Sequence, residues 1–236
     1  MSDYFVGLDP AGHGNDSTGL VAVEKITVRP PISNLDAAFN PNPNPPNEGT
    51  RLVVRHVARI REPSFLEQAE VIRETLKKIR GPKYMSPYGG EAYYKATCKV
   101  FIDATGLGAP FVDLLRNASV QATPVTLTSG QNVNSDGRGG ERVPKTDLIE
   151  ATQVALQTGK LKIASGMALG PELLKELKGY RMRLGSNGNT QFGNDVGPSD
   201  WREADHDDLV IALALGIWGA TDRRPSREAV IMANGL

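Results

Sequence analysis

The chain has a single cysteine, no net charge and no long apolar run, and each of these features excludes a class of protein or of binding site. The lone Cys98 excludes internal disulfides and zinc sites built from several thiolates. The 27 basic side chains balance the 27 acidic ones, so a polyanion would have to meet a local patch rather than an overall field. No apolar run approaches the roughly 18 residues of a membrane span, and no signal peptide opens the chain. These absences predict a cytoplasmic protein with no membrane partner.

Two short apolar runs in this chain end in an aspartate. Residues 6–8 lead into Asp9, after which the chain turns through Pro10 and Gly12, and residues 99–102 lead into Asp103. Such runs predict buried strands, and open α/β sheets bind ligands beyond the carboxyl ends of their strands. Each aspartate taken alone could equally begin a turn, because Asp is a common turn residue.

The remaining pattern predicts one domain over residues 1–236, with a core from about 4 to 220. A proline-rich insertion at about 30–48 is expected to lie outside the core, because proline removes ladder donors, and a charged tail covers 221–236. Periodicity predicts strands at 20–24, 51–60, 99–103 and 120–127, helices at 64–79, 110–115, 147–158 and 171–178, a short extended segment at 160–164, and a hairpin at 180–192. Loops are expected at 81–97 and, as a flexible loop or long hairpin, at 129–143.

Residues 209–218 are apolar on every side and predict a buried helix, which two acids, Asp207 and Asp208, precede. Acids in a first helical turn complement the helix dipole, which is one interpretation of this pair. Burying them without a cation or hydrogen-bond donors nearby is unfavourable. Together with Asp9 and Asp103 they form an all-oxygen ligand set, which suits Mg²⁺ or Mn²⁺ and not Zn²⁺. Two such ions about 3.5–4 Å apart could clamp both reacting oxygens of a phosphodiester.

The predicted order of elements is the ribonuclease H-like arrangement, an α/β fold with a mixed sheet flanked by helices and a C-terminal half rich in loops and hairpins. Within it, Gly-Leu-Asp-Pro-Ala at 7–11, Phe-Ile-Asp-Ala-Thr-Gly-Leu-Gly at 101–108 and His-Asp-Asp-Leu-Val-Ile-Ala-Leu-Ala-Leu at 206–215 resemble the nuclease domain of a tailed-phage terminase large subunit. Val-Pro-Lys-Thr-Asp-Leu-Ile at 143–149 resembles the same family. The resemblance extends from about residue 4 to residue 220, and its last motif is the most specific.

This resemblance implies an endonuclease that cuts double-stranded DNA with two Mg²⁺ or Mn²⁺ ions, as viral concatemers are cleaved during genome packaging. It implies that Asp9 bridges both ions, that Asp103 is the second acidic ligand, and that Asp208 is the late one. Asp207 is a close competitor of Asp208 for that role.

The resemblance also singles out His206, which could touch a metal ion or a phosphate, and Lys145, which could orient phosphate or water. A first-turn histidine with no metal role and a solvated lysine at a helix start are the alternatives. The implied partners are double-stranded DNA, an ATPase motor domain or subunit, the small terminase subunit and the portal, in the host cytoplasm.

One departure from the family pattern is the lack of a Gly-x-x-x-x-Gly-Lys-Ser/Thr loop to cradle phosphates, so ATP-driven translocation must come from another domain or subunit. The candidates for DNA contact are Arg138 and Arg142 in the polar segment at 129–143, and Arg181 and Arg183 on one face of the hairpin predicted at 180–192. Such side chains would bind backbone phosphates without reading bases. Each could instead be an ordinary solvated arginine.

Three other functions compete with this hypothesis. A resolvase-like nuclease of similar fold would prefer four-way DNA junctions and would need a dimer. A phosphotransferase of the actin-like or sugar-kinase fold also begins with a strand, an Asp and a Thr-Gly turn, but requires two related halves, and no duplication is visible. An inactive relative would keep metal or DNA binding without cleavage, although all the acids are present.

Overall fold

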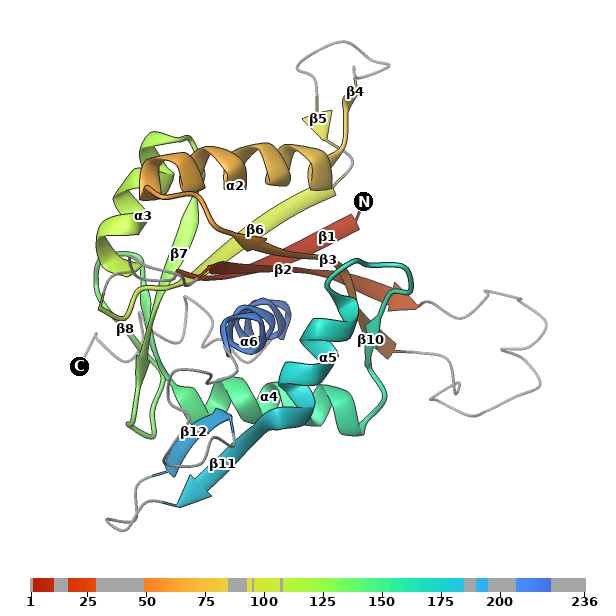
Figure 1. The fold of residues 1–236 in the computed structure, drawn as a ribbon, viewed down its shortest axis with the longest axis vertical. Coiled ribbons are helices and arrows are strands. Elements are labelled where there is room, and N and C mark those ends of the chain that lie inside the picture. Colours follow the sequence, from red (N-terminus) through yellow and green to blue (C-terminus); the bar gives the residue numbers. More distant parts are fainter. Residues whose placement is uncertain are drawn as a thin grey trace, which may run out of the picture.

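The computed structural model describes residues 2–10, 17–28, 49–84, 93–94, 96–106, 108–184, 190–194 and 207–221. Within these ranges an eight-stranded sheet has the order β10-β3-β2-β1-β6-β7-β9-β8 and carries helices on both faces (Figure 1). Its strands are β1 (Ser2–Asp9), β2 (Thr18–Val28), β3 (Gly49–Ile60), β6 (Ala96–Asp103), β7 (Ala122–Thr128), β8 (Asn134–Ser135), β9 (Glu141–Pro144) and β10 (Leu161–Ile163). Two small ribbons pair β4 (Lys83–Tyr84) with β5 (Tyr93–Tyr94) and β11 (Tyr180–Leu184) with β12 (Thr190–Asn194).

The sheet is mixed, as the sequence predicts. The strands β1, β2 and β3 form an antiparallel meander, whereas β6, β7 and β9 follow β1 in parallel. At the edges, β10 pairs in parallel with β3, and β8 pairs antiparallel with β9. Because parallel neighbours point the same way, the carboxyl ends of β1 and β6 meet at one edge of the sheet.

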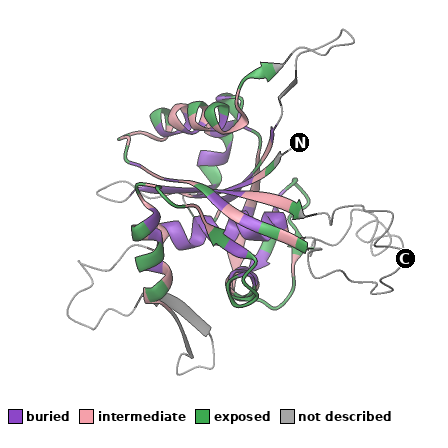
Figure 2. Cartoon of the chain, turned by 90° about the vertical axis from the view of Figure 1, so that its right-hand side faces the viewer, coloured by how far each residue is buried: buried purple, intermediate pink, exposed green. Residues whose placement is uncertain are grey.

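Side chains alternate between the two faces of the strands, and two hydrophobic clusters follow this alternation. On β1, Val6 and Leu8 pack with α2 (Phe65–Arg80) and α3 (Gly108–Asn117), whereas Phe5 packs on the opposite face. That opposite face is covered by α4 (Lys145–Gln157), α5 (Gly170–Gly179) and α6 (Asp208–Ala220). The central strands are therefore buried on both sides (Figure 2).

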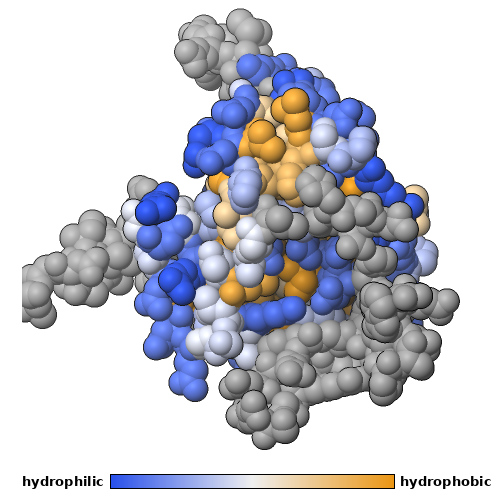
Figure 3. Space-filling view, turned by 60° about the vertical axis from the view of Figure 1, so that its left-hand side comes forward, coloured by the Kyte–Doolittle hydropathy of each residue, from blue (hydrophilic) through white to orange (hydrophobic). Residues whose placement is uncertain are grey.

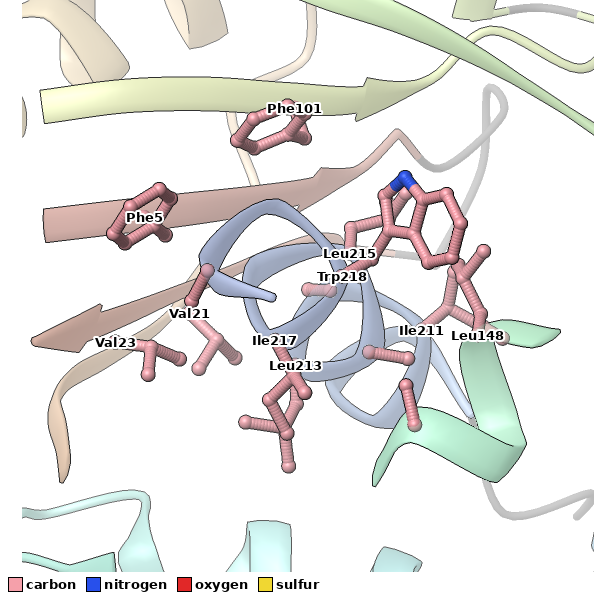
Figure 4. Packing of buried hydrophobic residues seen from close by; sticks show 14 of the residues in the cluster. Phe5, Val21, Val23, Phe101, Leu148, Ile211, Leu213, Leu215, Ile217 and Trp218 are labelled. Atoms are coloured by element: carbon pink, nitrogen blue, oxygen red, sulfur yellow. The ribbon is translucent and has the colours of Figure 1, made fainter. Parts of the chain in front are cut away.

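The helix α6 lies at the centre of the larger cluster. All of its residues after Asp208 are buried, which confirms the predicted buried helix. Figure 4 shows Trp218 of this helix between Phe101 of the sheet and Leu148 of α4, and Leu213 on the side of the helix turned away from Phe101. The indole Nε1 of Trp218 also donates to Oε2 of Glu141 at 3.2 Å, which ties the end of α6 to β9.

Two glycines allow α6 to lie directly on β1. A Cβ atom at Gly7 would lie 1.8 Å from the backbone oxygen of Ala212, and one at Gly216 would lie 3.1 Å from the backbone oxygen of Phe5. Backbone atoms cannot swing aside as a side chain can, so any larger residue at position 7 would push the helix off the sheet.

The structure corrects one expected loop, because segment 81–97 contributes β4, β5 and the start of β6. Segment 129–143, expected as a flexible loop or long hairpin, forms a hairpin of β8 and β9 at the edge of the sheet. Its polar composition did not indicate that β9 also pairs with β7 and buries the side chain of Val143. The proline-rich insertion lies outside the described residues, as does the charged tail after Thr221.

Apolar side chains form small groups among hydrophilic ones on the face in Figure 3. The large apolar side chains that are most exposed among the described residues are scattered over three helices: Leu66 of α2, Val154 and Leu156 of α4, and Leu174 of α5. Isolated exposed apolar residues are normal on globular proteins. None of the described helices has the length and apolar character needed to cross a membrane.

Candidate active site

Four backbone positions form one row across the sheet near the carboxyl end of β1. Asp9 pairs with Gly19 of β2, which in turn pairs with Arg59 of β3. On the other side of β1, residue 8 pairs with residue 102 of β6, so Asp9 and Asp103 are the next residues on two adjacent parallel strands. The sheet therefore brings the two strand-end acids side by side.

The side chains of this row lie on the face that α6 covers. Phe5 and Phe101 pack in the α6 cluster, and Asp9 and Asp103 follow them by an even number of residues on the same strands. Arg59 follows Val57 of the same cluster by two residues. Alternation therefore directs both acids and this arginine toward α6.

Asp103 is held by the turn that follows β6. The backbone N–H of Thr105 donates to Oδ1 of Asp103 at 2.8 Å, and the Thr105 hydroxyl accepts from the N–H of Leu127 at 3.0 Å. Gly106 has a φ of 60°, and a Cβ at Gly108 would lie 1.8 Å from the backbone oxygen of Asp103. The glycines of this motif are thus required by a left-handed conformation and by close backbone contact.

The first turn of α6 lies over the glycine of the row. A Cβ at Gly19 would lie 2.7 Å from the backbone oxygen of Asp208 and 3.2 Å from its Cβ. The Asp208 carboxylate accepts from Nη1 of Arg59 at 2.9 Å. Asp207 is the N-cap residue, but its side chain makes no capping hydrogen bond. Helix capping therefore does not account for Asp207.

Lys145, the first residue of α4, lies beside these acids. Its Nζ is 4.0 Å from Oδ2 of Asp207 and 6.0 Å from the centre of the Tyr180 ring. Burial raises the pKa of the Tyr180 phenol, and the negative charges of Asp207 and Asp9 add to that effect. The elements α4, β11 and α6 thus contribute to the surroundings of Asp9.

Burial and crowding raise the pKa of Asp9 well above its usual range. Desolvation is the largest cause, and the charges of Asp103, Asp208 and Asp207 add to it, whereas Lys145 acts in the opposite direction. Burial likewise raises the pKa of Asp103, against local hydrogen bonds and the charge of Lys145. The four acids form one electrostatic cluster in which a bound cation would be stabilised.

A buried ion pair lies beside this acidic cluster. The side chains of Arg59 and Glu176 of α5 are only 6% and 5% exposed, and Nη2 of Arg59 donates to Oε1 of Glu176. The other oxygen of Glu176 accepts from the backbone N–H of Leu209 at 3.2 Å. Burial raises the pKa of Glu176 to about 7, against the opposing effect of Arg59.

The acids offer the carboxylate oxygens that a hard cation binds, but their side chains are not arranged around a common point. In the part of the chain that the structure describes, no three Asp, Glu, His or Cys side chains converge on a common point that could hold an ion. Two of these acids have basic partners, since Asp208 lies 2.9 Å from Arg59 and Asp207 lies 4.0 Å from Lys145. The available donors are nevertheless carboxylate oxygens with mutually repelling charges, which suits Mg²⁺ or Mn²⁺.

Three other predicted residues cannot be placed in this cluster. His206 lies outside the described residues. Arg181 and Arg183 lie on β11, but their side chains are not described. Their roles remain predictions.

Arg138 and Arg142 are exposed. Arg142 lies on β9 between Glu141, whose side chain bonds to α6, and Val143, which packs in the α6 cluster. Alternation turns Arg142 toward the opposite face of the sheet from the acids. The structure thus does not bring Arg142 to the acidic cluster.

The sequence analysis missed three residues that shape the site, Arg59, Glu176 and Gly19. Glu176 had a usable signal, because it follows Leu173 by three residues on the inward face of its predicted helix, and an acid there needs a partner. Arg59 follows Val57 by two residues on the inward face of its predicted strand and gives a weaker signal of the same kind. For Gly19 the sequence offers no sign, because its role depends on the position of α6.

Comparison with known proteins identifies the fold. No family model matches the chain, and no curated protein matches it by sequence. Solved structures do match, and terminase nuclease domains are among them. The chain therefore has the fold of these domains, and the resemblance predicted from the sequence is confirmed at the level of the fold.

Two of these structures are similar to this chain over most of their length. The large terminase nuclease of thermophilic phage G20c, with bound magnesium, matches with a TM-score of 0.54 and 16% identity, over 92% of this chain and 81% of that one. The nuclease domain of the large terminase subunit gp2 of bacterial virus Sf6 matches with a TM-score of 0.52 and 14% identity, over 92% of this chain and 86% of that one. A further structure of that Sf6 domain holds manganese and beta-thujaplicinol and matches with a TM-score of 0.53.

Proposed function

We propose that this chain is a metal-dependent endonuclease that cuts double-stranded DNA during the genome packaging of a tailed phage, in the host cytoplasm. One observation carries the proposal. Asp103 from a neighbouring strand end and the two acids at the start of α6 gather around a partly buried Asp9, on a fold shared with terminase nuclease domains. Like charges in a partly buried place destabilise one another unless a cation offsets them.

The proposed cofactors are two Mg²⁺ or Mn²⁺ ions, held by Asp9, Asp103 and Asp208, with Asp207 and His206 as further candidate ligands. Magnesium and manganese are present in structures of the neighbouring nuclease domains, and this chain offers carboxylate oxygens, the ligands that such hard cations prefer. When bound, the ions would supply the positive charge that stabilises the attacking and leaving oxygens of the scissile phosphodiester.

The protein's own groups would position the substrate and control charge. Lys145, at 4.0 Å from Asp207, would place its ammonium against a phosphate oxygen or orient the attacking water. The raised pKa of Asp9 means that cation binding would release a proton from it near the pH at which it titrates. Arg138, Arg142, Arg181 and Arg183 are candidates for contacts with the DNA backbone outside the acidic cluster.

The proposed partners follow from this activity. The balanced charge of the chain predicts weak DNA binding by itself, because affinity for DNA arises mainly from phosphate neutralisation. An ATPase motor domain or subunit, together with the small terminase subunit and the portal, would deliver the DNA.

The test is incubation with supercoiled plasmid in EDTA, Mg²⁺ or Mn²⁺, with linear duplex and a four-way junction as parallel substrates. We expect nicked and linear plasmid with either metal and none in EDTA, with little sequence preference. A strong preference for the junction would instead support the resolvase-like alternative, and ATP hydrolysis without DNA cleavage would support the phosphotransferase. Metal binding with no cleavage of any substrate would identify an inactive relative.

A further inference from the structure

Arg59 is a nearly buried arginine whose contacts converge on the start of α6. Its side chain is 6% exposed. Nε contacts Glu172 at 2.8 Å, Nη2 contacts Glu176, and Nη1 contacts both the Ser17 hydroxyl at 2.8 Å and Asp208 at 2.9 Å. These partners come from the residue before β2 and from α5 and α6, so one guanidinium links three parts of the chain.

The contacts of Arg59 with residues other than Asp208 are enough to fix the orientation of its guanidinium. Glu172 engages Nε, Glu176 engages Nη2, and Ser17 engages Nη1, so each nitrogen has a partner other than Asp208. A planar guanidinium held on all sides has little freedom to rotate. Its Nη1 is therefore a fixed donor to which the Asp208 carboxylate is attached.

Glu176 couples the side chain of Asp208 to the backbone of α6. One of its oxygens accepts from Arg59, and the other accepts from the N–H of Leu209 at 3.2 Å. The same carboxylate thus anchors both the first turn of α6 and the arginine that holds Asp208. Gly19, beneath Asp208, leaves the room that this placement needs.

We propose that Arg59, supported by Glu176, is a positioning residue that holds Asp208 in place for a divalent cation. This inference rests on the proposed nuclease function. A carboxylate can accept at about four positions, so one contact with Arg59 on Oδ2 is compatible with a metal ion on the same side chain. Groups that orient metal ligands in this way set metal affinity.

The charges around Arg59 agree with this role. Three carboxylates, those of Glu172, Glu176 and Asp208, face one guanidinium, so excess negative charge remains at this corner. Asp9 and Asp103 lie on the same face of the sheet and add to it. The arginine therefore orders one acid without neutralising the cluster.

The experiment compares Arg59→Lys with a matched control, Arg55→Lys. Lysine keeps the charge but loses the planar fork. Arg55 lies on the same strand and contacts Glu24 at 2.8 Å, but its side chain is 45% exposed and faces no acid of the cluster. Mn²⁺ affinity is measured by isothermal titration calorimetry, and plasmid cleavage is followed in parallel. We expect Arg59→Lys to weaken Mn²⁺ binding by about 10–100-fold, and the control to change it by less than about twofold.

Two outcomes would overturn the inference. Unchanged Mn²⁺ affinity in a folded Arg59→Lys protein would mean that Arg59 has only a structural role, and tighter binding would mean that it competes with the cation. If Arg59→Lys fails to fold, the double variant Arg59→Met with Glu176→Gln removes the buried charges together and keeps an acceptor for Leu209. The same loss of Mn²⁺ affinity is expected from it.

The parent protein separates this inference from the proposed function. A parent that binds no Mn²⁺ and cuts no DNA removes both. A parent that binds Mn²⁺ and cuts plasmid, with an Arg59→Lys variant of equal Mn²⁺ affinity, removes only the role of Arg59.

Discussion

At the scale of single residues, Asp9 is the position where stability and the proposed function conflict. Its carboxyl is partly buried, and desolvation together with three neighbouring acids raises its pKa. A carboxyl whose pKa is raised on folding contributes stability at low pH, and that contribution is lost as the pH rises through the folded-state pKa. Without a cation, ionised Asp9 should therefore destabilise the protein at neutral pH.

We expect Asp9→Asn to abolish most plasmid cleavage, by orders of magnitude, because it removes the charge that would draw cations to the cluster. In EDTA the melting temperature of the variant should rise relative to the parent as the pH is raised from about 4 to 8, since asparagine cannot ionise. Calorimetry across this pH range and plasmid nicking in Mn²⁺ provide the two measurements. A variant that cuts as well as the parent would refute the proposed mechanism.

The two acids at the start of α6 should differ in how much each contributes to DNA cleavage. Asp208 is fixed by Arg59 at 2.9 Å, whereas Asp207 lies 4.0 Å from Lys145 and makes no capping bond. We expect Asp208→Asn to reduce cleavage in Mn²⁺ by orders of magnitude and Asp207→Asn to reduce it less. The reverse order, measured on the same plasmid with melting temperatures as control, would make Asp207 the main ligand.

At the scale of elements, the site depends on how closely α6 approaches the sheet. The first residue of this helix, Asp208, lies over Gly19 of the row, and Gly7 allows the contact further along β1. A shift of α6 would therefore move Asp208 relative to the strand-end acids.

We expect Gly7→Ala to lower the free energy of unfolding by at least about 1–3 kcal/mol, because its Cβ would meet the backbone oxygen of Ala212 at 1.8 Å. Gly130→Ala is the matched control, since a Cβ there would have only an ordinary contact at 3.6 Å with the Thr128 hydroxyl oxygen. Urea unfolding followed by circular dichroism measures both. Equal stability of the two variants would show that α6 can move away from β1 without lowering the free energy of unfolding.

At the scale of the whole molecule, we expect the proline-rich insertion to be separable from the sheet. The last pair between β2 and β3 joins Val28 to Gly49, so the two strand ends are already adjacent. Hairpins need only about 2–5 residues to connect such ends.

We expect replacement of residues 31–47 by a short glycine linker to leave folding and plasmid cleavage mostly intact. The melting temperature and the cleavage rate of the shortened protein check this. Loss of soluble protein would show that the insertion packs on the domain.

Much of the fold could be predicted from local pattern. The helix predicted at 64–79 is α2, which Ser64 caps by accepting from the N–H of Glu67 at 3.2 Å, and Gly159 follows α4, the helix predicted at 147–158, with a φ of 66°. The pairing of β9 with β7 could not be predicted, because the segment of β9 is polar and shows no strand periodicity of its own.

The sequence alone determined where the acids stand on their elements. An apolar run ending in Asp9 or Asp103 becomes a strand with an acid at its end, and an all-apolar run after Asp208 becomes a buried helix, because period and composition decide burial. Only the tertiary structure decided which face these acids share and what holds them. Arg59 meets Asp208 across 149 residues of chain and Glu176 across 117, and contacts at such separation depend on the assembled sheet and not on any local pattern.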